Sequence, residues 1–308
     1  MRYASIDIGT NTILMLIGDV DGEMRINPLK DFYSVPRIGK SVSTTGRLDD
    51  DSVARALDVL TRYKASAEEY HADLVIASAT SAVRDAKNRN IFIARVKEEC
   101  GIDVEIIEGE TEARLGFLGA VSGAPDIFGT SLVVDIGGGS TELSYGTGAA
   151  PESFVSVNIG AVRITERFFH HNPPLPGELE EAGKFVSEAL RSFPFDRLKA
   201  DRVIAVAGTA TTLALIEQGT YEFDPRLVNN YEMSAKSLFS VFEVLMTKSP
   251  KEIRKMTNAA EGREDVLLAG ALILKKVIQT AGSASFITTD RGLRYGYLLY
   301  KQMQLSAK

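Results

Sequence analysis

The sequence is poor in the residues that build disulfides and soft-metal sites, with one cysteine, three histidines and no tryptophan in 308 residues. A single cysteine, Cys100, excludes an intramolecular disulfide framework and a cysteine-rich zinc site. Three histidines leave little for a histidine-based metal centre. Any bound metal is therefore expected to be hard and oxygen-ligated, Mg²⁺ before Zn²⁺.

The sequence also lacks a basic excess and a long apolar run. Thirty-five Lys and Arg stand against 41 Asp and Glu, which gives a formal net charge of −6. This balance argues against DNA or RNA binding, which needs a broad basic face, although a local basic patch can still bind a polyanion. No uncharged apolar stretch reaches the roughly 20 residues that span a bilayer, and Asp7 interrupts the first apolar run, unlike in a signal peptide. We expect a cytoplasmic protein without a membrane or nucleic-acid partner.

Short apolar runs alternate with helical patterns along the chain, which predicts an α/β fold. Strands are expected at residues 3–8, 13–20, 74–77, 104–107, 131–136, 141–145, 203–207 and 285–288, and helices at 48–70, 91–100 and 110–121. Residues 34–48 include Arg37, Lys40 and Arg47 but no acid, and we predict an exposed basic loop there. Such a loop either meets an anionic substrate or is simply solvated, and the sequence leaves both open.

The tripeptide Asp-Ile-Gly occurs twice, at residues 7–9 and 135–137, each time between two predicted strands and at the start of a hydroxyl-rich turn. Two unrelated β-turns are the alternative, because Gly, Asn and Thr are common in turns. An identical tripeptide at the start of each half favours an internal duplication. We therefore expect two α/β domains, residues 1–124 and 125–308, on either side of a cleft. The last helix is a candidate for packing back on the first domain.

These turns have the composition of phosphate-binding sites. Backbone N–H groups and hydroxyls of Gly137 to Thr141 converge on one point, and Thr10, Asn11 and Thr12 offer a second such site. The preceding Asp7 and Asp135 would repel phosphate and are better suited to hold a Mg²⁺ that bridges to it. A third turn, Gly208-Thr209, either receives an anion at a helix N-terminus or is a tight turn capped by Thr209. Taken alone, the second interpretation is favoured.

One carboxylate of the helix 110–121 has no basic partner on its own helix. Glu112 is followed by Leu115 and Gly116 at the relevant spacings, and then by Gly119, so it lies along a strip of small residues. It is either solvated or directed into a cleft, where it could deprotonate a water for in-line attack on phosphorus. The sequence leaves these two alternatives open.

Seven segments, taken in order, resemble the exopolyphosphatase and guanosine pentaphosphate phosphohydrolase family. They are residues 7–12, 80–84, 109–114 (GETEAR), 135–143 (DIGGGSTEL), 208–212, 262–265 and 290–294. That family belongs to the actin, sugar kinase and heat-shock ATPase superfamily. The resemblance runs over nearly the whole chain, and it implies two ribonuclease H-like α/β domains that flank a cleft.

The resemblance also implies roles for individual residues. Glu112 matches the catalytic glutamate that activates water, Asp135 and Glu142 match the acids that hold Mg²⁺, and Arg84 matches an arginine that contacts substrate phosphate. By itself Arg84, beside Asp85, would be interpreted as a surface arginine. The two phosphate turns match at Thr10, Asn11 and Thr12 and at Gly137, Gly138, Gly139, Ser140 and Thr141.

Four departures from the family pattern accompany these matches. Thr111, the pair Asn229-Asn230 and Tyr295 each replace residues that are common in relatives. Long relatives also add a helical HD-like domain that helps to hold extended polyphosphate. No such domain follows in this sequence, which puts a processive grip on very long chains in doubt.

The expected activity is Mg²⁺-dependent hydrolysis of the terminal phosphoanhydride of inorganic polyphosphate. The 5′-phosphate of guanosine pentaphosphate is the second candidate substrate. A phosphotransferase that passes phosphate to ADP is an alternative, because a phosphate cradle cannot distinguish water from a nucleotide acceptor. A non-catalytic nucleotide sensor is disfavoured by the acidic residues. The resemblance suggests a homodimer.

Overall fold

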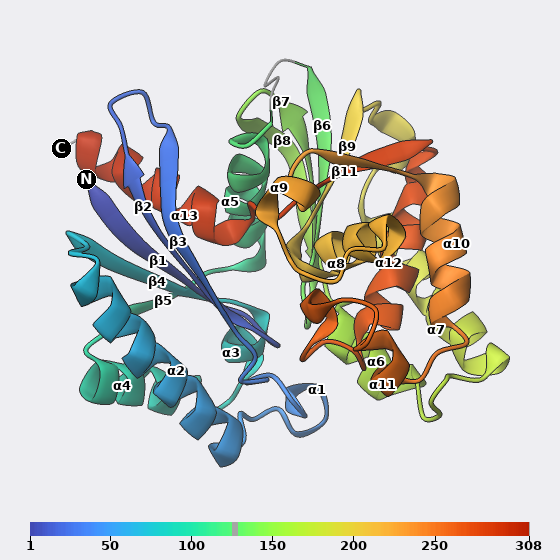
Figure 1. Ribbon diagram of the computed structural model, residues 1–308, viewed down its shortest axis with the longest axis horizontal. Coiled ribbons are helices and arrows are strands. Elements are labelled where there is room, and N and C mark those ends of the chain that lie inside the picture. The colour runs from blue at the N-terminus through green and yellow to red at the C-terminus, as the bar shows by residue number, and fades with distance from the viewer. Residues whose placement is uncertain (125–128, 308) are drawn as a thin grey trace.

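Two mixed β-sheets lie side by side in the computed structural model, which describes residues 1–124 and 129–307 (Figure 1). The first sheet has the order β3-β2-β1-β4-β5, and the second has the order β10-β11-β9-β6-β7-β8. The strands of the first sheet are β1 (Arg2–Ile8), β2 (Ile13–Val20), β3 (Ile26–Ser34), β4 (Leu74–Ala79) and β5 (Val104–Ile106). Those of the second are β6 (Thr130–Ile136), β7 (Thr141–Thr147), β8 (Ala150–Val157), β9 (Arg202–Val206), β10 (Tyr231–Ser234) and β11 (Ser285–Thr289).

The two sheets repeat one topology, which supports the predicted duplication. In the first, β1, β2 and β3 form an antiparallel meander, and β4 and then β5 continue on the other side of β1 in parallel. In the second, β6, β7 and β8 form the meander, with β9 and then β11 parallel beyond β6. The two sheets with their helices confirm the α/β class. We call the part around the first sheet the first half and the part around the second sheet the second half.

The helices cover the sheets because each presents an apolar stripe. Those before the second sheet are α1 (Val42–Thr45), α2 (Asp50–Glu69), α3 (Ser81–Asp85), α4 (Arg89–Cys100) and α5 (Gly109–Val121). The later ones are α6 (Ala161–Phe168), α7 (Pro176–Ala189), α8 (Ala207–Gln218), α9 (Pro225–Val228), α10 (Ala235–Leu245), α11 (Pro250–Ile253), α12 (Leu267–Ala281) and α13 (Leu293–Ser306). No helix in the described part of the chain is long and apolar enough to cross a membrane.

Helices α5 and α13 lie between the two sheets (Figure 1). Each packs on the sheet that is built from the other part of the chain. The C-terminal α13 packs on β1 and β2, where Tyr297 and Leu298 join Tyr3 and Leu16 in one apolar cluster. Helix α5 packs on β6, β7 and β8 instead, and its Phe117 belongs to a cluster with strand residues of the second sheet. The chain segment that was expected to close the first domain therefore also covers the second sheet.

Glycines let α5 and α13 cross at close range. A Cβ on Gly119 of α5 would lie 2.1 Å from the carbonyl oxygen of Gly292, and one on Gly296 of α13 would lie 1.7 Å from the carbonyl oxygen of Leu115. The strip of small residues that follows Glu112 in the sequence is thus used by a neighbouring helix. Its close packing joins the two halves beneath the cleft.

The predicted basic loop is only partly a loop and only partly exposed. Short helix α1 lies within residues 34–48, and Pro36, Ile38 and Val42 are buried there. Lys40 and Arg47 are exposed as expected. Arg37 is not free, because its guanidinium pairs with Asp265 of the second half. Charge spacing along the chain cannot reveal a partner 228 residues away.

Candidate active site

A cavity of about 630 Å³ lies between the two halves. The predicted turns and acids meet there: Asp7, Thr10, Asn11, Thr12, Glu112, Asp135, Gly137, Gly138, Ser140, Glu142, Gly208 and Thr209 all line it. Gly139, Thr141 and Arg84 are not among its lining residues. The structure therefore brings most of the predicted site residues to one place.

The two phosphate turns are closed by equivalent backbone hydrogen bonds. Gly9 N–H donates to the Thr12 carbonyl at 2.9 Å, and Gly137 N–H donates to the Ser140 carbonyl at 3.0 Å. The second residue of each turn also accepts a backbone hydrogen bond from the segment beyond the meander. Gly39 N–H donates to Thr10, and Val162 N–H donates to Gly138. Equivalent local hydrogen bonds thus fix both turns.

The second turn packs directly on the first half. A Cβ on Gly138 would lie 2.9 Å from Cβ of Thr10, and a Cβ on Gly139 would lie 2.6 Å from Oγ of Ser81. The Thr10 and Ser81 hydroxyls are themselves 3.0 Å apart and buried. Gly138 and Gly139 therefore permit a close approach of the two halves, and Gly139 serves this packing without lining the cavity.

Thr141 differs from its predicted role. It is the first residue of β7 and is fully buried, and its hydroxyl donates to the Ile159 carbonyl. This hydrogen bond occupies the side chain away from the cavity. The Thr141 side chain is therefore not placed to bind phosphate, because its hydroxyl is used by the Ile159 carbonyl and does not line the cavity.

Three acids line the cavity near the two turns: Glu142 is buried, and Asp7 and Asp135 are half-buried. Asp135 and Glu142 are paired residues of β6 and β7, so their side chains project from the same face of the sheet. Burial raises the pKa of Asp135 to about 6. Burial, and then the nearby Asp135 charge, raise the pKa of Glu142 to about 8. The pKa of Asp7 rises to about 7 for the same two reasons, and its Oδ1 has no hydrogen-bond partner.

This acidic set fits Mg²⁺ only as a largely hydrated ion. Within the described residues, no three carboxylate, imidazole or thiol groups lie close enough together to hold a metal. Mg²⁺ usually keeps several waters and binds through one or two carboxylates and substrate phosphates. Asp135 and Glu142 on one face, with the unpartnered oxygen of Asp7, suit that mode, and a cation would relieve their raised pKa values.

Glu112 faces the cavity from the first turn of α5, and its side chain is only 12% exposed. Burial, and then the Glu142 charge, raise its pKa well above the ordinary value. Arg84 opposes this effect, because its Nη1 donates to Oε2 of Glu112 at 3.0 Å and to the Ile107 carbonyl at 2.9 Å. Glu112 is therefore neither solvated nor unpaired, and its partner comes from α3. Glu112 lines the cavity, whereas its partner Arg84 does not.

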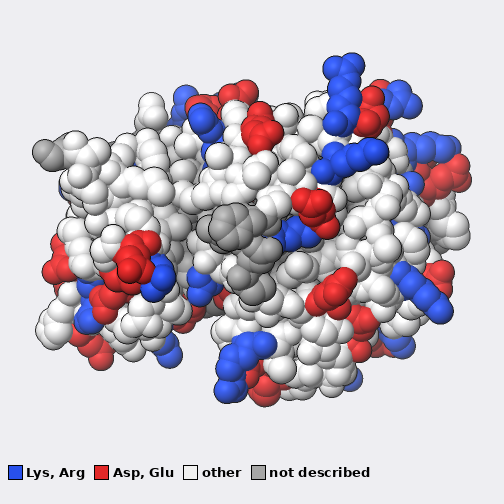
Figure 2. Space-filling view, turned by 90° about the horizontal axis from the view of Figure 1, so that it is seen from above, with Lys and Arg blue, Asp and Glu red and all other residues white. Residues whose placement is uncertain are grey.

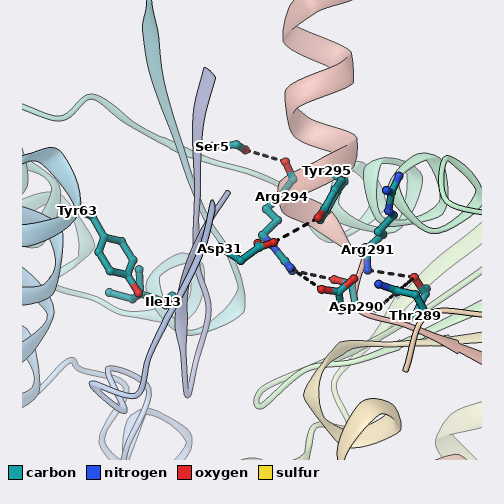
Figure 3. Close-up of polar contacts among 10 residues, drawn as sticks. Ser5, Ile13, Asp31, Tyr63, Thr289, Asp290, Arg291, Arg294 and Tyr295 are labelled. Atoms are coloured by element: carbon teal, nitrogen blue, oxygen red, sulfur yellow. Dashed lines mark hydrogen bonds and ion pairs between the residues drawn. The ribbon is translucent and has the colours of Figure 1, made fainter. Parts of the chain in front are cut away.

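Arg294 is a cavity residue that the sequence did not single out. Its side chain is 8% exposed, and it lies between Asp31 of β3 at 2.9 Å and Asp290 at 3.2 Å (Figure 3). Its charge also lowers the pKa values of Asp7 and Asp135 against the effect of burial. The segment 290–294 could be flagged by resemblance, but the Asp31 partner lies 263 residues away.

The family departures have structural partners. Asn229 Oδ1 accepts from Thr289 Oγ1 at 2.8 Å and from Asp290 N–H at 2.9 Å. Tyr295 is buried, and the guanidinium of Arg294 lies 4.9 Å from its ring centroid (Figure 3). Both replacements therefore support the segment that carries Arg294.

The third turn is not capped as the simpler interpretation predicted. Helix α8 begins at Ala207, its N-cap is Val206, and Thr209 makes no cap hydrogen bond. Gly208 is instead covered by the guanidinium of Arg263, whose Nη1 lies 1.0 Å from the place of a Gly208 Cβ. The turn lines the cavity beneath a cation of the second half.

Comparisons with known proteins identify the family of this chain. The model of the Ppx/GppA phosphatase family matches residues 19–305. Exopolyphosphatase 2 of Mycobacterium tuberculosis is 34% identical over 90% of this chain and 89% of its own length. The crystal structure of the Aquifex aeolicus family member is 32% identical, with a TM-score of 0.83, and covers 99% of this chain and 98% of its own. An exopolyphosphatase from Cytophaga hutchinsonii is 27% identical, with a TM-score of 0.90, over 99% of this chain and 98% of its own. With its paired turns and buried glutamate between two α/β halves, the chain thus belongs to the Ppx/GppA phosphatase family and is a hydrolase of phosphoanhydride bonds.

Proposed function

We propose that this protein removes the terminal phosphate of inorganic polyphosphate by Mg²⁺-dependent hydrolysis. The observation that carries the proposal is Glu112, a nearly buried carboxylate of raised pKa that lines a cavity between two phosphate-type turns. The exopolyphosphatases among the relatives favour polyphosphate as the substrate.

Glu112 acts as the general base in this proposal. Its raised pKa makes it a stronger base than an exposed glutamate near neutral pH. Arg84 holds Oε2, which leaves Oε1 to accept the proton of the attacking water. Backbone N–H groups of the two turns and the hydroxyls of Thr12 and Ser140 hold the phosphates in line for attack.

Mg²⁺, held by Asp135 and Glu142 with Asp7 nearby, would neutralise phosphate charge at the second turn. Glycine residues there let backbone N–H groups approach the phosphate. Arg294 keeps the buried acids from accumulating uncompensated charge. The protein's own part is therefore to orient the phosphate chain, restrict water and remove one proton.

Guanosine pentaphosphate is the second candidate, because aromatic side chains line part of the cavity. Tyr33 and Phe223 are among the lining residues, and the Arg263 guanidinium lies 5.2 Å from the Tyr33 ring centroid. A planar base can stack on such a surface, whereas polyphosphate has no group that would use it.

Phosphate release decides between these substrates. Wild type and Glu112→Gln are compared on short polyphosphate, long polyphosphate and guanosine pentaphosphate, with Mg²⁺ and with or without ADP. We expect release from polyphosphate, and a loss of about 10²-fold or more in Glu112→Gln, as for a lost general base. Glu110→Gln, an exposed glutamate of the same helix, is the matched control and should retain activity.

Each other result has its own meaning. Release from the guanosine substrate alone would make the protein an alarmone phosphohydrolase. ATP formed from ADP would identify a phosphotransferase, and tight nucleotide binding without release would identify a sensor. Near-normal turnover of Glu112→Gln would remove Glu112 from the role of base.

We also propose a cytoplasmic homodimer that does not bind nucleic acid. The net charge of −6 supports the last point. Basic and acidic side chains are interspersed on the face seen in Figure 2, without a broad basic area. Light scattering after size-exclusion chromatography would test the dimer, and a molar mass near that of one chain, 33.5 kDa, would contradict it.

A further inference from the structure

A short segment of the second half lies across the first half at the cavity. The Gly262 carbonyl accepts from Nδ2 of Asn11 at 3.0 Å and from Nη2 of Arg37 at 3.2 Å. Asn11 belongs to the first phosphate turn, and Arg37 follows β3 in the same half. The segment 261–265 is therefore attached to the turn itself.

Arg37 and Asp265 form a fork-shaped ion pair across the two halves. Nη1 lies 2.7 Å from Oδ2 and Nη2 lies 2.9 Å from Oδ1. The side chains are 35% and 36% exposed. An isolated surface ion pair contributes little to stability. A bidentate pair that shares a third hydrogen bond also fixes the relative position of the two groups.

The backbone on both sides is shaped for this contact. Arg37 has a φ of 55°, in the left-handed region that favours glycine, and its N–H donates to the Asn11 carbonyl at 3.0 Å. Gly262 has a φ of 76°, and a Cβ there would lie 2.7 Å from Val35. A non-glycine residue persists in this region only where its surroundings determine it. These surroundings are the contacts with Asn11, Gly262 and Asp265.

The attached segment carries Arg263 into the cavity. Its Nη2 donates to the Tyr33 hydroxyl at 2.8 Å, and its guanidinium covers Gly208 at the start of α8. Arg263 thereby presents a cation to the cavity beside the third turn. Its place depends on the residue beside it, Gly262, which Arg37 and Asn11 hold.

We propose that Arg37 is a positioning residue for the reaction. Its clasp on Gly262 and Asp265 holds Arg263 over the cavity and keeps the cleft mouth closed on a bound phosphate chain. This role differs from direct contact with the distal chain, because the guanidinium is occupied by Asp265. The inference rests on the proposed phosphohydrolase function, and it assigns to Arg37 and Asp265 the retention of substrate rather than the chemical step.

The test breaks the clasp from either side with Arg37→Gln and Asp265→Asn. Hydrogen–deuterium exchange of residues 258–267 without substrate should rise about fivefold, because local opening becomes easier. The Kd of tripolyphosphate and the KM for polyphosphate should rise roughly tenfold, with kcat within about twofold. The conservative variant Arg37→Lys keeps a cationic donor for Asp265 and the Gly262 carbonyl, and it should stay within about threefold of wild type in all three values.

Arg2→Gln is the matched control. Arg2 forms a comparable fork with Asp19, with side chains 33% and 38% exposed, but this pair joins β1 and β2 within the first half. It should leave exchange at residues 258–267 and the KM unchanged.

Three results would overturn the clasp: unchanged exchange in both single variants, changes in Arg37→Lys as large as those in Arg37→Gln, or raised exchange with an unchanged tripolyphosphate Kd and KM. A wild type that binds tripolyphosphate but releases no phosphate would refute the proposed hydrolysis instead. The clasp would then be decided by exchange and by Kd.

Discussion

The two halves share a turn but not its chemistry. The same backbone hydrogen bond closes residues 9–12 and 137–140. Opposite Asp7 in the first half stands Leu14, whereas opposite Asp135 in the second stands Glu142. The second half therefore has two acids where the first has one.

The hydrogen-bond donors of the two turns also differ, and here the first turn has more side-chain groups. The first turn offers the side chains of Thr10, Asn11 and Thr12, whereas the second offers mainly the backbone of Gly137, Gly138 and Gly139. One side chain of the first turn, Asn11, joins the halves through the Gly262 carbonyl, whereas the Thr10 hydroxyl pairs with Ser81 of its own half. The repeated backbone thus carries a pair of facing acids in the second half and a side-chain contact to the other half in the first.

The largest expected effect comes from removing the acid that the first half lacks. Glu142→Gln should lower turnover by about 10²-fold, or about 2.7 kcal/mol of activation free energy, and raise the Mg²⁺ concentration for half-maximal rate. It should also raise thermal stability at pH 8.5, because a buried acid with a pKa of about 8 is largely charged there and the neutral amide is not. Steady-state rates over a Mg²⁺ titration, with thermal unfolding, check both.

Leu14→Met, at the equivalent position of the first half, is the control for Glu142→Gln and should keep turnover within a few-fold. Equal losses in both variants would mean that the two positions matter for packing alone. A Glu142→Gln protein with normal Mg²⁺ dependence would remove Glu142 from the cation site.

The next largest effect is a change in stability with pH, caused by Asp7, the single acid that precedes the first turn. In the unfolded chain Asp7 ionises near pH 3.8, but in the fold its pKa is about 7. The native state thus binds more protons between these values, so stability falls as pH rises through this range and the cost is complete above pH 7. In EDTA, wild type should be less stable at pH 8 than at pH 5.

Asp7→Asn should reduce that difference by on the order of 2 kcal/mol, because the amide does not ionise. Urea unfolding at both pH values measures it. Exposed Asp58→Asn serves as the control and should leave the difference unchanged. A wild-type profile that rises between pH 5 and pH 8 would contradict the buried state of these acids.

Most of the strands and the two turns could be predicted from the sequence, because alternation and turn composition are local properties. Strands β8 and β10 were not predicted. The cavity roles of Arg294 and Arg263 could not, since their partners Asp31 and Tyr33 lie 263 and 230 residues away. The spacing of Gly116 and Gly119 indicated a close neighbour of α5, but only the packing shows that Gly119 meets Gly292 and α13, whereas Gly116 faces Asp135. Likewise, the charge pattern revealed Arg37 without its partner.

The smallest expected effect concerns Thr141, which the structure places in a strand and not in the phosphate turn. Thr141 occupies the place that Ile13 has in the first half, since each pairs with the isoleucine of its own Asp-Ile-Gly. Thr141→Val should cost about 1 kcal/mol of stability, because the buried Ile159 carbonyl loses its donor. The KM for polyphosphate should stay unchanged, since the side chain does not line the cavity. Ile13→Val is the matched change in the first half. A several-fold rise in KM for Thr141→Val alone would return its hydroxyl to the phosphate site, and the second turn would then bind through side chains as the first does.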